Sequence, residues 1–85
     1  MRKEVENKLN EALSLTNGVL TETQIDSVTS LMYAGEWNLS VETLCETLYE
    51  YDLPIPERVY ELLQDLGLSL DIKTKYWEVL KPQIH

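Results

Sequence analysis

The stretch from residue 37 to residue 51 repeats apolar side chains at the spacing of one face of an α-helix. Its members, separated by four, three, four and three residues, are Trp37, Val41, Leu44, Leu48 and Tyr51. Because an α-helix turns once in about 3.6 residues, these side chains all point to one side and are expected to face a core. Pro54 is expected to stop the helix, since proline cannot donate the hydrogen bond that would continue it.

The same helical spacing recurs on both sides of this segment. The apolar stripes of four further helices are Val5, Leu9, Ala12 and Leu13; Ile25, Val28, Leu31 and Met32; Val59, Leu62, Leu63 and Leu66; and Ile72, Tyr76, Trp77 and Leu80. No strand-like alternation or hairpin dipeptide competes with this pattern. The sequence therefore predicts an all-α fold, a small single-domain bundle of about five short helices that comprises residues 1–85.

Helix boundaries are indicated by residues that cap or interrupt helices. Gly18 is expected to adopt a left-handed conformation after the first helix, and Gly67 is expected to close the fourth. Thr21 and Gln24 have the three-residue spacing of a capping box at the start of the second helix. Asp71 is expected to cap the last helix.

Length and composition restrict the class of protein. With 85 residues, of which 44% are hydrophobic, the chain can form one small core. Cys45 is the only cysteine, so an internal disulfide is impossible, and its spacing predicts a small buried side chain on the third helix. No segment has the features of a signal peptide, and no apolar run approaches the roughly 20 residues that span a bilayer. We therefore expect a soluble, cytoplasmic protein without membrane contacts.

The residues that most catalytic sites need are sparse. Histidine occurs only as His85, where the chain is expected to fray, so no nucleophile–histidine pair or histidine-containing metal site can form. The acids lack the spacing of a calcium-binding loop. Asp26-Ser27-Val28 is similar to the phosphopantetheine attachment site of acyl carrier proteins, but Ser27 is predicted to lie inside a helix and not at its start. We expect no enzyme activity, catalytic residue, cofactor or metal.

Acidic residues dominate the middle of the chain. The formal net charge is -8, and no lysine or arginine occurs between Lys8 and Arg58. Eight acidic residues and one basic residue lie between Glu36 and Asp65. Such a field repels nucleic acid and favours a basic protein partner.

Two of the predicted helices carry these acids in rows at four-residue spacing, opposite their apolar stripes. The rows are Glu42, Glu46 and Glu50 on the third helix, and Glu57, Glu61 and Asp65 on the fourth. Four like-charge pairs result, each of which costs a helix roughly 0.2–0.5 kcal/mol. A solvated helix face is one interpretation, but the absence of compensating lysines favours partner binding. Tyrosines at the borders of the rows are either core residues with accessible hydroxyls or contact residues. The expected binding surface consists of Glu42, Glu46, Tyr49, Glu50, Asp52, Glu57, Tyr60, Glu61 and Asp65.

Several short motifs within residues 21–81 resemble one protein family. They are Ala34-Gly35-Glu36-Trp37, the run Leu44-Cys45-Glu46-Thr47-Leu48-Tyr49-Glu50-Tyr51-Asp52-Leu53-Pro54-Ile55, Tyr60-Glu61-Leu62 and Tyr76-Trp77. Together they resemble the MafI family of bacterial immunity proteins. The resemblance implies a cytoplasmic protein that neutralises a secreted toxin encoded beside it, as in contact-dependent growth inhibition and other polymorphic toxin systems. Several such toxins are nucleases, including EndoU-type ribonucleases.

The charge distribution and the resemblance imply the same kind of partner. We expect an immunity protein, a monomer in a 1:1 complex, whose acids occlude the basic active site of a nuclease toxin. It would not contact nucleic acid itself. The alternative is an acidic nucleic-acid mimic or regulatory module that blocks a DNA-binding protein.

Overall fold

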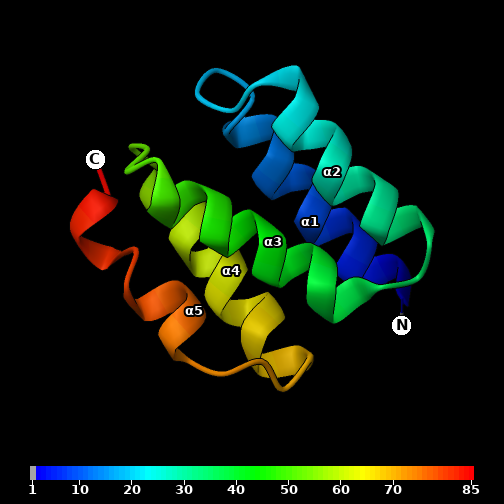
Figure 1. Cartoon of the computed structure of the whole chain (residues 1–85). Coiled ribbons are helices and arrows are strands. Elements are labelled where there is room, and N and C mark those ends of the chain that lie inside the picture. Colours follow the sequence, from blue (N-terminus) through cyan, green and yellow to red (C-terminus); the bar gives the residue numbers. More distant parts are fainter. Residues whose placement is uncertain (1) are drawn as a thin grey trace.

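Five α-helices, joined by short connections, make up most of the computed structural model, which describes residues 2–85 (Figure 1). They are α1 (Arg2–Leu15), α2 (Glu22–Tyr33), α3 (Trp37–Glu50), α4 (Glu57–Ser69) and α5 (Lys75–Glu78), followed by a 3-10 helix, Lys81–Gln83. The only extended pairing among the described residues is an isolated parallel bridge between Ile55 and Ile84. The predicted all-α bundle of five short helices is confirmed.

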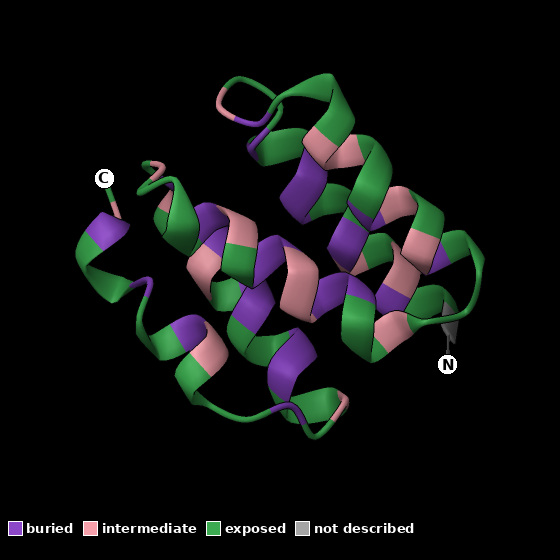
Figure 2. Ribbon diagram, in the orientation of Figure 1, coloured by how far each residue is buried: buried purple, intermediate pink, exposed green. Residues whose placement is uncertain are grey.

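The helices pack in pairs, α2 against α3 and α1 against α4, and α3 and α4 also contact each other. The short α5 packs on α3 and α4, on the side of this pair away from α1 and α2 (Figure 1). Buried residues lie along the faces that meet between the helices (Figure 2). The radius of gyration is 11.3 Å, close to the roughly 12 Å expected for a folded chain of this length.

The apolar stripes form one hydrophobic core, as their spacing predicted. Its largest fully buried side chains include Leu9, Met32, Leu44, Leu48, Leu62, Leu63, Leu66, Trp77 and Leu80. Tyr51 is an exception, because α3 ends one residue before it and its side chain is 57% exposed. Ile55, 1% exposed, contributes to the core just beyond that helix end. The predicted burial of Cys45 is confirmed.

Three helices end with a residue in the left-handed conformation, namely Gly35 after α2 (φ 79°), Asp52 after α3 (φ 50°) and Asp71 after α4 (φ 58°). The closing backbone bonds run from Glu36 N to Leu31 O (2.9 Å), from Leu53 N to Leu48 O (3.1 Å) and from Ile72 N to Gly67 O (2.8 Å). This arrangement satisfies carbonyls at the helix end that would otherwise lack donors. The prediction for Asp71 is therefore wrong: it ends α4, and α5 begins only after Thr74.

Two predictions for glycine are also wrong. Gly18 does not adopt a left-handed conformation, because the chain leaves α1 through right-handed turns that bring Leu20 into the core. Gly67 lies inside α4, which continues past it to Ser69, and the ring of Trp77 packs against the glycine. The capping box is confirmed, with Thr21 and Gln24 bonded reciprocally.

The C-terminal segment is bonded to the end of α3 and to the loop that follows. The buried Gln83 amide donates to Leu48 O (2.8 Å) and Leu53 O (2.9 Å). Ile55 N donates to Gln83 O (3.0 Å), and His85 N donates to Ile55 O (2.9 Å). The expectation that the chain frays at His85 is therefore wrong for its backbone, which the bridge to the loop holds in place.

Candidate functional site

The acidic row on α3 lies on the outer face of the helix, opposite its buried stripe. Glu46 and Glu50 are exposed, and Glu42 is partly buried. Among the side chains of residues 3–85, no lysine, arginine or histidine nitrogen forms an ion pair with these carboxylates or with Asp52. Glu50 and Asp52 lie at the C-terminal end of α3, which is the negative end of the helix dipole. The last turn of the helix contains no basic residue to offset their charge. These acids therefore lower the stability of the helix that displays them.

The acidic row on α4 has a different environment, because α1 packs beside it and supplies a cation. Glu61 lies 3.5 Å from the guanidinium of Arg58, and Asp65 lies 3.8 Å from the ammonium of Lys8. Arg58 also donates two hydrogen bonds to Glu11, of 3.0 and 3.2 Å, and this pairing lowers the pKa of the Glu11 carboxyl. The expectation of a row without compensating cations is thus wrong for α4.

The two acidic rows lie beside different helices. The α3 row borders α5, since Glu46 shares a pocket with α5 residues, whereas the α4 row borders α1 through Lys8 and Arg58. Figure 1 shows α1 and α5 on opposite sides of the α3–α4 pair. The nine predicted residues therefore divide into two groups with different neighbours. Glu57, exposed at the start of α4, belongs to the second group.

The two tyrosines at the borders of the rows differ in exposure. Tyr49 on α3 is 56% exposed, whereas Tyr60 on α4 is partly buried and packs against the core. Tyr60 therefore matches the interpretation of a core residue with an accessible edge. Tyr49 offers a large, rigid aromatic side chain beside the acids of α3, a residue type enriched among interface residues that dominate binding energy.

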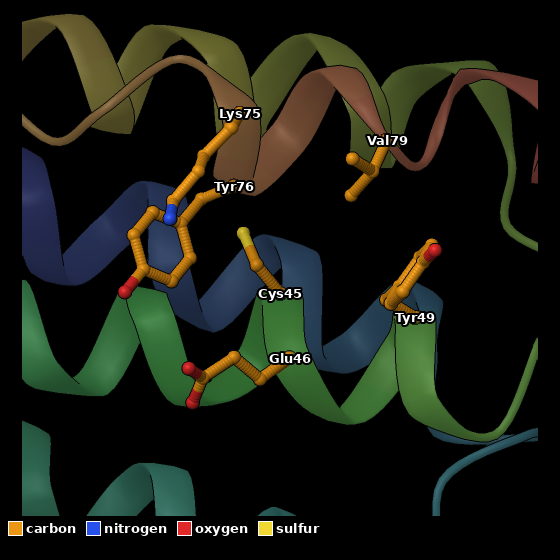
Figure 3. A pocket seen from close by; sticks show the side chains of 6 residues that line it. All are labelled: Cys45, Glu46, Tyr49, Lys75, Tyr76 and Val79. Carbon is orange, nitrogen blue, oxygen red and sulfur yellow. The ribbon is translucent and has the colours of Figure 1, made fainter.

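A pocket of about 210 Å³ opens between α3 and α5, beside the α3 row (Figure 3). Its lining residues are Cys45, Glu46 and Tyr49 of α3, with Lys75, Tyr76 and Val79 from α5 and its C-terminal cap. The pKa of Tyr76 is raised, chiefly by the negative charge of Glu42 and then by partial desolvation and Glu46. The sequence did not identify this site, because no local pattern shows that α5 docks on this face of α3.

The structure offers little to support covalent or metal chemistry. Burial, and then the charges of Glu42 and Glu46, raise the pKa of the Cys45 thiol to about 12, so the reactive thiolate is scarce at neutral pH. Ser27 lies within α2, as predicted, and its hydroxyl donates to Thr23 O (3.1 Å). Residues 2–85 contain no group of three or more histidine, cysteine or acidic side chains placed to hold a metal ion.

None of the helices described here is both long enough and apolar enough to cross a lipid bilayer. Comparisons with protein-family models, with curated proteins and with solved structures found no match to this chain. The resemblance to the MafI family therefore stays a prediction that depends on the motifs between residues 21 and 81.

Proposed function

We propose that the chain is an immunity-type inhibitor that binds a basic surface of a toxin domain through one face of α3. This α3 surface is defined as Glu42, Glu46, Tyr49, Glu50 and Asp52. The observation that carries the proposal is a row of carboxylates, beside an exposed tyrosine, that form no ion pair with the described side chains of the chain. Acids that destabilise their own helix and pair with no cation among the side chains of residues 3–85 are best explained by a cation supplied from outside.

Inhibition would occur by occlusion and would need no chemistry on this chain. A ribonuclease must present lysine, arginine or histidine to the phosphate backbone of RNA. An acidic protein that pairs with those residues covers the site and removes the positive potential that attracts the substrate. The resemblance to immunity proteins favours a nuclease of this kind, such as an EndoU-type ribonuclease, in a 1:1 complex.

Two double variants with the same change in charge test which surface is used. Glu46→Gln/Glu50→Gln neutralises two acids of the α3 surface, and Glu61→Gln/Asp65→Asn neutralises two acids beside α1. Each variant is co-expressed with the toxin domain encoded next to this protein, and cell survival and co-purification are measured. The first variant should lose protection, and the second should retain most of it. Equal protection by both variants, with both shown to be folded by circular dichroism, would exclude the α3 surface.

The alternative function makes a different prediction for the same protein. A blocker of a DNA-binding protein should release that protein from DNA in a mobility-shift experiment and should give no protection against the toxin. Survival that does not depend on this chain, together with release of a partner from DNA, would therefore replace the immunity proposal with the alternative.

A further inference from the structure

We propose that the pocket between α3 and α5 receives one arginine side chain of the partner protein. The inference rests on the proposed function, since it names the chemistry by which a basic partner would be held. It assigns a recognition role to Lys75, Tyr76 and Val79, which lie outside the surface expected from the sequence.

The size and shape of the pocket suit a single side chain. Its volume of about 210 Å³ is below the range of roughly 300–1,000 Å³ that is typical of small-molecule sites. Tyr76 and Tyr49 stand on its two sides, Cys45 lies between them, and Val79 lies on the α5 side, across from Tyr49 (Figure 3). These apolar walls match the methylene stem of a long side chain, which arginine and lysine bury while their charged ends stay near water.

The electrostatics of the pocket favour a cation. Glu46 lines it directly, and Glu42 is close enough that its charge is the main cause of the raised pKa of Tyr76. The ammonium of Lys75 lies 5.8 Å from the centre of the Tyr76 ring, within the range of about 6 Å for a cation–π contact. A positive group of the chain itself thus already occupies this ring face.

Among possible occupants, arginine fits these features best. Its planar guanidinium stacks on tyrosine rings and pairs with a carboxylate through two hydrogen bonds, which a lysine ammonium cannot do. A purely apolar side chain would desolvate Glu46 without supplying a partner for its charge. An acidic side chain would be repelled by Glu42 and Glu46.

Lys75 gives the inference a sharp test, because it competes with an incoming cation for Tyr76. Its side chain is exposed, so Lys75→Gln should leave the fold intact while removing one positive charge at the pocket. Affinity for a cationic occupant should then rise about threefold, a shift well within what one exposed cation–π contact supplies. If the pocket instead receives an acidic side chain, Lys75→Gln should weaken binding of the partner. If it receives an apolar side chain, the affinity should not change.

The probe is N-acetyl-arginine amide, titrated into the isotope-labelled full chain and followed by amide chemical shifts. We expect saturable shifts confined to residues around Cys45, Tyr49 and Val79, with dissociation constants of order 1 mM for so small a ligand. N-acetyl-norleucine amide, which has an apolar stem but no charge, should bind at least several-fold more weakly. Equal shifts with both probes, or no saturable shifts with the arginine probe, would overturn the inference.

Tyr49 and Tyr51 provide a matched pair of variants. The two side chains are 56% and 57% exposed, but only Tyr49 lines the pocket, whereas Tyr51 follows the last residue of α3 and does not line it. Tyr49→Ala should abolish the saturable shifts, whereas Tyr51→Ala should leave them within about twofold of the original. Equal loss in both variants would show that the pocket is not the binding site.

This titration does not involve the toxin, so the two proposals can fail separately. If the protein protects cells but does not bind the arginine probe, the proposed role of the pocket is wrong and the proposed immunity function is unaffected. Arginine binding without protection would remove the immunity function and leave a cation-binding pocket whose partner must be a different protein.

Discussion

The indole ring of Trp77 occupies the space that a side chain at Gly67 would need. A Cβ atom added at Gly67 would overlap with ring atoms Cζ3, Cε3 and Cη2 of Trp77, although the residue lies inside α4. Glycine costs a helix interior about 1 kcal/mol relative to alanine. The fold accepts this cost because the gap lets a large aromatic side chain of α5 reach the core.

Gly67→Ala should therefore destabilise the protein although alanine is the better helix former. Overpacking of a core typically costs about 1–3 kcal/mol, and urea unfolding followed by circular dichroism measures it. Gly18→Ala is the control, because nothing lies within 4 Å of a Cβ there and the backbone is not left-handed. Its effect should stay within about 0.5 kcal/mol. Similar losses in both variants would show that Trp77 does not depend on the gap.

Gln83→Leu should also destabilise the protein, because it removes the buried amide that donates to Leu48 O and Leu53 O. Leu48 O keeps the bond from Leu53 N, but Leu53 O loses its side-chain donor, and an unsatisfied buried group costs about 1–3 kcal/mol. Gln64→Leu, on the exposed face of α4, makes the same chemical change without a buried bond. A midpoint of thermal unfolding that falls equally in both variants would contradict the assigned role of Gln83.

Alkaline pH should weaken the fold through Cys45. Its pKa is about 12 in the folded protein and near 9 when unfolded, so above pH 9 the unfolded chain loses a proton that the folded chain keeps. The free energy of unfolding should therefore fall as the pH rises from 9 towards 12. In urea titrations between pH 8 and 10.5, Cys45→Ala should show a shallower decline, whatever its stability at pH 7. Parallel slopes would assign the decline to other groups, such as Tyr76, whose pKa is also raised.

Glu50→Lys should stabilise the fold and weaken toxin binding. The change places a cation at the negative end of α3 and turns the repulsion from Glu46 into an attractive pair, each worth about 0.3–1 kcal/mol. Glu57→Lys is the matched control, since it also creates an attractive pair, with Glu61, but places the cation at the positive end of α4. It should therefore stabilise the fold less than Glu50→Lys or destabilise it, as chemical denaturation can measure. Equal stabilisation by both variants would show that the dipole argument for the α3 acids is wrong.

Association with the toxin should be slowed by salt. The carboxylates of the α3 surface form no ion pair among residues 3–85, and attraction beyond about 8 Å is screened at physiological ionic strength. Stopped-flow mixing at low and high salt should therefore show a large change in the association rate and a smaller change in dissociation. An association rate that is insensitive to salt would mean that the acids play no part in recognition.

Helical spacing predicted the five helices and most of the core, because burial of an amphipathic stripe is a local property of the sequence. The errors fall at helix ends. Asp52 and Asp71 adopt the left-handed conformation usually taken by glycine, and Gly67 was read as a helix end because its contact with Trp77 is a tertiary one. Gln83 was missed for the same reason, since its acceptors are about 30 residues away.

The candidate site was predictable only in part. The outward direction of Glu42, Glu46 and Glu50 follows from their position relative to the stripe of α3. The separation of the two acidic rows does not, because it depends on α1 lying beside α4 and contributing Lys8 and Glu11. Likewise, the pocket requires α5 to dock on α3, which no pattern within either segment indicates.

Half of the pocket lining comes from α5, a helix of four residues, and its C-terminal cap. A helix this short has no stability of its own, so it persists only while Trp77 and Gln83 remain docked. The pocket wall and the C-terminal segment should therefore open together, as a cooperative unit of lower stability than the four longer helices. Filling the pocket should then slow amide hydrogen exchange more in this unit than in the rest of the molecule. Occupancy of the binding site and order at the C-terminus become two measurements of one equilibrium.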